Sequence, residues 1–362
     1  MAPSKGPKAS KRPNPTTKPV PEIDPNSSFT PESFERELKA LAAKAKEETW
    51  SRFLASQSKV YLSSLALLAL AALASNASQL ALSPVFGAIP SARHHAKLVA
   101  AACFVGWSSN LFLGRALPFK PVYLLPIIAL YIPATQFFLT PFSDALSAKW
   151  GPVVTETLTL FPIVALSAAC VATYLDGADL TALPSWLADA APGIGSYGVF
   201  KGVEAWSWGL LQEYSGRTAL NTRVGLELVL GASYALLAPS KLLLWAVPAL
   251  LHTAVLDTRV PTAGALQRLN GTLGAEGWVI FDRKESVTGY ISVVESLKDG
   301  FRLMRCDHSL LGGEWVKYIG QGHFKGNQVA EPVYGVFAML EAVRLVKIPK
   351  RIADEDAKAL VM

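Results

Sequence analysis

Tyr290-Ile-Ser-Val-Val-Glu295 is followed by Lys298-Asp-Gly300 and then by Phe301-Arg-Leu-Met-Arg-Cys306. In the first and the last of these segments, alternate residues fall on opposite faces, as they do in a β-strand. Asp299-Gly300 is a dipeptide that tight hairpin turns favour. The sequence therefore predicts an antiparallel hairpin, in the only part of the chain that is typical neither of a disordered tail nor of long apolar helices.

The residues on either side of this hairpin extend the prediction. Ser309-Leu-Leu311 is a further apolar run, and Gly312-Gly313 predicts a turn at its end. Cys306-Asp307-His308 also predicts a turn, because neighbours on a strand point to opposite faces and cannot form a nucleophile, a base and an orienting group together. Glu331-Pro332 then precedes a helical pattern from Val333 to Arg344. A small sheet followed by a helix predicts the entry to a larger α/β domain.

Three segments of this region resemble the small β-domain and first helix of the spermidine synthase (polyamine aminopropyltransferase) family, and most closely its membrane-attached fungal members. They are Thr288-Gly-Tyr-Ile-Ser-Val293, Phe301-Arg-Leu-Met-Arg-Cys-Asp307 and Glu331-Pro-Val-Tyr334. The resemblance implies that Asp307, Glu331 and Tyr334 bind substrate, with Tyr334 lining a polyamine pocket.

The same resemblance implies a Rossmann-like methyltransferase domain, and Lys358-Ala-Leu-Val-Met362 resembles its first strand. The glycine-rich donor loop is expected beyond this strand, and Ala330 stands where the family has its catalytic Asp. We therefore expect no catalytic residue, no bound cofactor and no turnover by this chain alone. A longer form is expected to use decarboxylated S-adenosylmethionine or S-adenosylmethionine, with a polyamine or another nucleophile as acceptor.

The composition points to a membrane protein. Hydrophobic residues make up 51% of the chain and charged residues only 17%, which is too apolar for an ordinary soluble domain. The net charge of +6 is concentrated in a basic tail, residues 1–29, which is predicted to be disordered and is interpreted as solvated or close to anionic lipid rather than bound to nucleic acid. Cys103, Cys170 and Cys306 lie too far apart for a disulfide framework or a metal motif.

Residues 30–58 predict an amphipathic helix. Thr30-Pro31 is a favoured helix start, and Phe34, Leu38 and Leu41 form one apolar stripe. Two placements remain open for this helix, one on the membrane surface and one against the C-terminal domain.

Residues 59–257 predict a membrane region of six spans, because several apolar runs approach the ~20 residues that cross a bilayer. The segment Gly198–Tyr214 is interpreted as an interfacial helix, because it carries Lys201, Glu204 and Glu213. The distribution of basic residues then places the N-terminus and the C-terminal domain in the cytoplasm. The six runs are Val60–Leu82, Ala96–Leu113, Val122–Phe142, Val153–Leu175, Thr222–Ala238 and Leu242–Leu256.

The polar residues of this region give no prediction of a site. His94-His95 is interpreted as a solvated pair in a short exterior loop, without the further ligands that zinc needs. Glu156 and Glu227 lie near the starts of predicted spans, where each is expected to reach the interface. No buried cationic partner for either residue is evident in the sequence.

Two functional hypotheses follow. Residues 258–362 form either the small cytoplasmic domain of a transferase related to spermidine synthase, or the self-associating domain of a non-catalytic multi-span scaffold or transporter. The predicted hairpin supports the second hypothesis as a surface for a homodimer, because the resembling family packs it between subunits and a chain that ends here would leave its edge unpaired. Continuation of the chain into Gly-x-Gly favours the transferase, and paired polar groups deep among the spans favour a transporter.

Overall fold

The computed structural model describes residues 31–180, 184–286, 289–318 and 331–333. The chain divides into two compact units, Met1–Ser56 and Gln57–Met362. Helix α1, Pro31–Phe86, begins in the first unit and ends in the second. Within the first unit, Glu35 and Lys39 form an exposed ion pair one helical turn apart, and the rings of Trp50 and Phe53 meet edge to face at 5.9 Å. The predicted helix over residues 30–58 is thus confirmed from Pro31 onward, and its two possible placements stay open.

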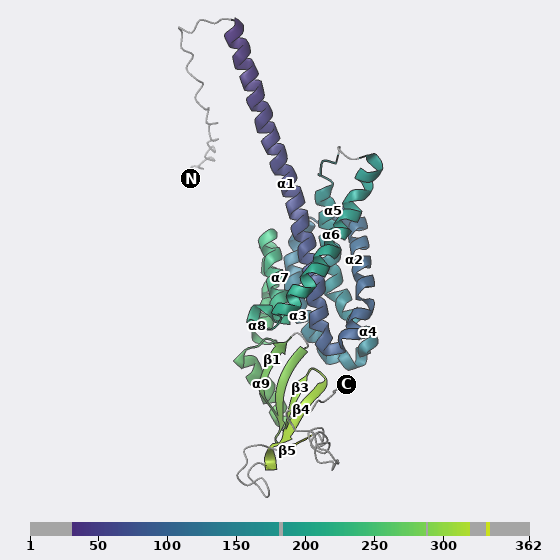
Figure 1. Cartoon of the computed structure of the whole chain (residues 1–362), viewed down its shortest axis with the longest axis vertical. Helices are drawn as coiled ribbons and strands as arrows, with labels where there is room; N and C mark the ends of the chain where they lie inside the picture. Colours follow the sequence, from purple (N-terminus) through teal and green to yellow (C-terminus); the bar gives the residue numbers. More distant parts are fainter. Residues whose placement is uncertain (1–30, 181–183, 287–288, 319–330, 334–362) are drawn as a thin grey trace, which may run out of the picture. The chain divides into compact units, whose positions relative to one another are not determined.

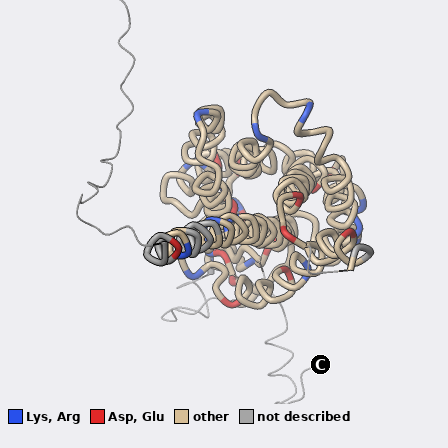
Figure 2. The backbone as a smooth tube through the Cα atoms, turned by 90° about the horizontal axis from the view of Figure 1, so that it is seen from above, with Lys and Arg blue, Asp and Glu red and all other residues tan. Residues whose placement is uncertain are grey.

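The second unit is mostly helical (Figure 1). Seen from above in Figure 2, most of its helical backbone carries uncharged residues. After α1 come α2 Ala88–Ala116, η1 Pro121–Leu124, α3 Leu125–Leu139, η2 Thr140–Phe142, α4 Ser143–Leu158, α5 Leu160–Leu175, α6 Ser185–Tyr214, η3 Ala219–Asn221, α7 Arg223–Leu237, η4 Lys241–Ala246, α8 Val247–Val255 and α9 Ala263–Glu276.

Apolar side chains of α1, α2, α3, α5 and α7 form the core of this helical bundle. Leu67, Leu125 and Ile163 are each 1% exposed or less. Gly106 of α2 lies so close to α5 that an added Cβ would stand 2.0 Å from the carbonyl oxygen of Ala165. The absence of a side chain at Gly106 therefore lets α2 and α5 pack backbone against backbone.

The six predicted runs do not each correspond to a separate long helix in the described residues, and the number of spans stays a prediction. Three helical segments there are long and apolar enough to cross a membrane by length and composition, namely Trp50–Phe86, Ala88–Ala116 and Pro121–Leu175. The predicted span Val153–Leu175 is divided at Thr159, where α4 ends and α5 begins. The last two predicted spans are the short helices α7 and α8, the second of which has only nine residues in regular α-helix.

The segment Gly198–Tyr214 is helical, as predicted, and its interfacial position stays a prediction. This segment is the second half of α6, and Phe200 and Ser207 on one of its faces are 1% exposed. Glu204 is buried on the same face, while Trp206 on the opposite face is 70% exposed. The charge of Glu204 is accommodated by Lys201 on the same helix and by Ser75 of α1, and the second partner is not evident from the amino-acid sequence of α6.

The C-terminal part of the second unit is a five-stranded antiparallel sheet in the order β1-β2-β3-β4-β5 (Figure 1). The predicted hairpin is confirmed, because β2 and β3 pair from Ile291 opposite Cys306 to Ser296 opposite Phe301. The predicted turn at Cys306-Asp307-His308 is confirmed as well, since Asp307 has a φ of 49° between two paired strands. The strands are β1 Trp278–Ser286, β2 Gly289–Ser296, β3 Phe301–Cys306, β4 Ser309–Trp315 and β5 Glu331–Pro332.

Other expectations for this region fail or stay untested. Gly312-Gly313 is not a turn but the middle of β4, where Met304 and Leu303 of β3 pair with the two glycines. Strand β1 and helix α9 were not predicted, because each has only a short apolar pattern interrupted by charged or small residues. The predicted helix from Val333 to Arg344 and the predicted strand from Lys358 to Met362 lie outside the described residues, except for Val333 itself.

Candidate functional site

The most elaborate polar arrangement of the bundle is a cluster contributed by four helices, which we call the His95 cluster. It consists of Ser75 of α1, His95 of α2, Glu156 of α4, and Lys201 and Glu204 of α6. Ser75 is fully buried, Glu156 is 1% exposed and Glu204 is 8% exposed. Isolated charges at such depth are strongly unfavourable, so the hydrogen bonds between these side chains decide whether the cluster is stable.

His95 is at the centre of this cluster. Its Nδ1 atom lies 2.6 Å from Glu156 Oε1, and its Nε2 atom lies 2.8 Å from Ser75 Oγ. The hydroxyl of Ser75 donates to Glu204 Oε1 at 2.6 Å, and the ammonium of Lys201 pairs with Glu204 Oε2. Ser75 thus links the imidazole of His95 to the carboxylate of Glu204, while the other ring nitrogen of His95 contacts Glu156.

Further side chains complete the hydrogen bonds of the two carboxylate groups. Gln79 and Ser78 donate to Glu156 Oε1 at 3.1 Å and 3.3 Å. Asn76 donates to the backbone oxygen of Glu204 at 2.8 Å and to Ser207 at 2.9 Å. The cluster therefore joins α1, α2, α4 and α6 through directional contacts, which fix the rotation of each helix against the others.

Ser75, His95 and Glu156 also have the spacing of a nucleophile, a base and an orienting carboxylate. The arrangement does not support nucleophilic catalysis, for two reasons. Ser75 is 0% exposed, and its proton goes to Glu204 rather than to His95. We therefore interpret the His95 cluster as an ionic lock within the bundle.

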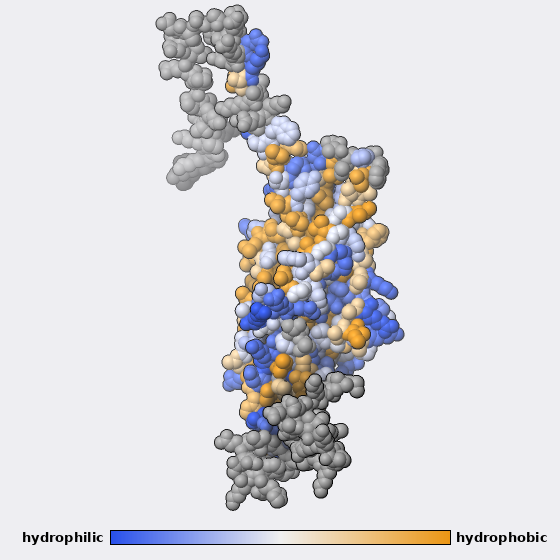
Figure 3. Space-filling model, viewed as in Figure 1, coloured by the Kyte–Doolittle hydropathy of each residue, from blue (hydrophilic) through white to orange (hydrophobic). Residues whose placement is uncertain are grey.

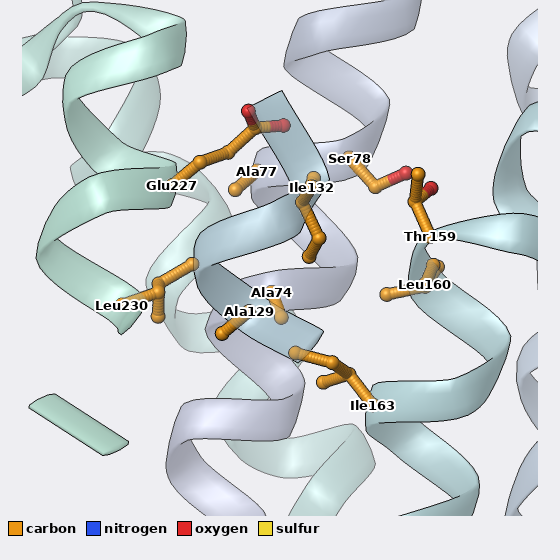
Figure 4. Close-up of a pocket in the computed structure, with 10 residues that line it drawn as sticks. All are labelled: Ala74, Ala77, Ser78, Ala129, Ile132, Thr159, Leu160, Ile163, Glu227 and Leu230. Carbon is orange, nitrogen blue, oxygen red and sulfur yellow. The ribbon is translucent and has the colours of Figure 1, made fainter. Parts of the chain in front are cut away.

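A second polar group lies around Glu227 of α7, which is 3% exposed. Gln136 of α3 donates to Glu227 Oε1 at 2.6 Å, and Arg259 donates to the side-chain oxygen of Gln136 at 3.2 Å. The other oxygen, Oε2, has no hydrogen-bond partner among the described residues. Figure 4 shows Glu227 across a cavity of about 10 Å³ from Ser78 and Thr159, a volume sufficient for about one water molecule.

The bundle and the sheet meet at a buried ion pair. Arg223, at the start of α7, donates from its backbone nitrogen and from Nη1 to Glu285 Oε2 of β1, at 2.8 Å and 3.2 Å. Its Nε atom donates to the backbone oxygen of Leu80 in α1 at 2.5 Å. The ring of Tyr290 lies 5.2 Å from the guanidinium, and burial, together with the charge of Glu285, raises the pKa of the Tyr290 hydroxyl. One arginine therefore links α1, α7, β1 and β2.

The residues predicted to bind substrate lie in and beyond the sheet. Asp307 forms the turn between β3 and β4, where its Oδ1 accepts from the backbone nitrogen of Tyr290 at 2.7 Å. The backbone of Glu331 pairs with Trp315 at the edge of the sheet. Tyr334 lies outside the described residues, as does the side chain of Glu331, so the structure does not bring the three together as a site. For Asp307 it shows a role in the turn.

The interpretations of the polar residues in the bundle are wrong in a consistent way. His95 lies in helix α2 and not in a loop, and its side chain is 12% exposed rather than solvated. Glu156 and Glu227 are buried instead of reaching an interface. The available signal was their position in apolar runs, because a charged residue that is retained there needs a polar partner.

Comparison with known proteins identifies one similarity over most of the chain. The sequence is 39% identical over 300 residues, or 82% of the chain, to an N-terminal histidine N-methyltransferase from Emericella nidulans. The chain covers 53% of that protein, so it spans about half the length of this curated relative. No protein-family model matches the chain, and no solved structure matches it significantly.

This similarity corrects the functional expectations. The relative is a histidine methyltransferase and not a spermidine synthase, so the resemblance drawn from residues 288–334 assigned the wrong family. The expectations that depended on this resemblance are also wrong, namely polyamine biosynthesis, an aminopropyl donor and a polyamine acceptor. The relative's name also gives no support to an integral membrane scaffold or transporter. The similarity extends over far more of the chain than the short motifs on which the resemblance depended.

Proposed function

We propose that this chain is part of an enzyme that methylates the N-terminal histidine of a polypeptide. The observation that carries the proposal is the 39% identity over 300 residues to a protein of that activity. The match covers 82% of the chain, so wherever it begins it includes most of the bundle and residues of the sheet. The helices are thus part of what the two proteins share.

We propose S-adenosylmethionine as the methyl donor. Binding sites for such nucleotides use a glycine-rich turn between a strand and a helix in a parallel sheet. The described strands are all antiparallel, and the described glycines with positive φ cap helices or form turns between neighbouring elements. The described residues therefore do not fit the donor, and none is assigned to it. A Rossmann-like domain that follows the sheet is part of the proposal.

The experiment uses the protein purified from its own cells. It is incubated with S-adenosylmethionine and a peptide that begins with histidine, and mass spectrometry locates any added methyl group. The matched control peptide has the same sequence with an acetylated N-terminus, and a diamine is offered separately. We expect one methyl group on the N-terminal histidine and none on the diamine. A protein that leaves the histidine peptide unchanged, or that modifies the diamine instead, contradicts the proposal.

We propose in addition that the bundle lies in a membrane. The cytoplasmic location of residues 1–29 and 258–362 follows only from the distribution of basic residues and remains a prediction. The proposal is supported by the three helical segments of sufficient length and by large apolar side chains on the outside of the bundle. Phe104, Phe112, Leu236 and Leu244 are each more than 70% exposed. Release of the protein from cell membranes by alkaline carbonate alone would contradict this location. Self-association through the sheet remains a prediction.

A further inference from the structure

A shallow cleft of about 530 Å³ lies between α2, α4 and the start of α5, and we call it the α2–α4 cleft. Its lining has two chemically distinct parts. Arg93, His94, Lys97 and Lys149 supply basic groups, and no acidic side chain of the described residues lines the cleft. Leu98, Trp150, Val153 and Phe161 supply an apolar surface directly beside them.

Helical spacing explains why these residues reach the same opening. Arg93 and Lys97 are one turn apart on α2, so their side chains leave the helix on the same face. Lys149 and Val153 have the same relation on α4. In Figure 3, hydrophilic side chains gather at the edge of the bundle where Figure 1 places α2 and α4.

The positive charge of the cleft is not balanced by the protein. Within the described ranges, Arg93, Lys97 and Lys149 form no ion pair with a carboxylate. The ammonium of Lys149 instead lies 5.3 Å from the ring centroid of Trp150, which is 55% exposed. The carboxylate of Glu156 on the same helix points to the interior, where it is bound by His95. Three cations thus surround one opening without an anionic partner in the part of the chain that the structure describes.

We propose that the α2–α4 cleft binds the phosphate-bearing headgroup of an anionic phospholipid. The basic side chains match the phosphate, and the apolar side chains match the first part of an acyl chain. A free phosphate ion would leave Leu98, Val153 and Phe161 without a partner. A tryptophan beside lysines is also a common arrangement at the level of lipid headgroups. The inference depends on the proposed membrane location and not on the proposed methyl transfer.

The test uses Trp150 as a reporter in the full protein in detergent. Phosphatidylglycerol with brominated acyl chains is titrated into the sample, and the quenching due to Trp150 is taken as the difference from the Trp150→Phe variant. The triple variant Arg93→Gln, Lys97→Gln and Lys149→Gln removes the three charges. The matched control, Arg115→Gln, Lys120→Gln and Lys241→Gln, removes one arginine and two lysines from exposed positions elsewhere on the bundle.

We expect the cleft variant to bind the anionic lipid more weakly by on the order of a hundredfold, since each basic residue near an anionic lipid contributes favourably. The control variant should bind within about twofold of the unmodified protein. Equal quenching by brominated phosphatidylcholine would overturn the proposal, because it would show contact with acyl chains without headgroup selection. Displacement of the lipid by millimolar inorganic phosphate would also overturn it, in favour of a free anion site. Circular dichroism of both variants separates loss of binding from loss of fold.

Discussion

The bundle and the sheet use charged residues in opposite ways. In the bundle, Glu156 and Glu204 are buried while Phe104 and Leu236 are exposed. In the sheet, the ion pairs of Arg302 with Glu295 and Glu314 lie partly in solvent, with side chains between 15% and 42% exposed. The bundle therefore buries some charged groups within its largely apolar interior and exposes large apolar side chains, whereas Arg302 and its two partners in the sheet lie near the surface. The buried charge of the sheet is Glu285, which pairs with Arg223 of the bundle.

This difference affects what each charge contributes to stability. A partly exposed pair contributes little, because water and salt screen it and ordering two long side chains costs entropy. A buried pair also has a small net value when it is complete, since desolvation opposes the attraction. Removing one partner of a buried pair is different, because the remaining charge is left without water or a counter-ion. The two regions should thus respond very differently to the same substitution.

The largest difference is expected between Arg223 and Arg302. Arg223→Met leaves Glu285 buried and uncompensated and removes the hydrogen bond to Leu80, so it should lower the free energy of unfolding by about 3–5 kcal/mol. Arg302→Met removes pairs that are partly exposed and should cost about 1 kcal/mol or less. Chemical unfolding in detergent, followed by circular dichroism, measures both. Equal losses for the two variants would contradict the distinction between the regions.

A smaller loss of stability is expected from a substitution in the His95 cluster. Ser75→Ala removes the hydroxyl between His95 and Glu204, so both side chains lose a shared hydrogen-bond partner. Because these groups are buried, we expect a loss of about 2–3 kcal/mol in the same unfolding measurement.

Ser108→Ala provides the control for this substitution. The hydroxyl of Ser108 binds only the backbone oxygen of Phe104 on the exposed side of α2, so its loss should change stability by less than about 0.5 kcal/mol. If the Ser75 variant were as stable as the Ser108 variant, the His95 cluster would not be the ionic lock that the hydrogen bonds indicate.

These contacts also show where sequence reasoning succeeded and where it failed. Apolar runs predict that segments such as Val60–Leu82 are helical, because that property depends on the local sequence. Lys201 is a local partner of Glu204, three residues away, but Ser75 does not follow from local sequence, since it is 129 residues away along the chain. Each of the charged residues, considered alone, was therefore placed at an interface. The structure shows that they satisfy one another in the interior.

The sheet gives the same lesson at a smaller scale. Two alternating segments with Asp299-Gly300 between them predicted the β2–β3 hairpin correctly, because a hairpin is determined by neighbouring residues. Gly312-Gly313 was predicted as a turn from its composition, although both glycines lie within β4. A glycine inside a strand often marks a close approach of another chain segment, and that segment is not evident from the glycines themselves.

The smallest predicted effect distinguishes these two glycines. A Cβ at position 313 would stand 2.5 Å from Leu303 Cδ2 and 2.8 Å from the backbone oxygen of Arg302, so Gly313→Ala requires the β3–β4 pairing to shift. We expect it to lower the free energy of unfolding by about 1–2 kcal/mol. A Cβ at position 312 meets no atom within 4 Å, so Gly312→Ala should be nearly neutral. If Gly312 and Gly313 formed a turn, the backbone conformation of the turn would favour glycine at both positions. In a strand, glycine is needed only where an added Cβ would meet a close neighbour, which here is position 313. A larger loss for Gly312→Ala than for Gly313→Ala would therefore contradict the observed strand register.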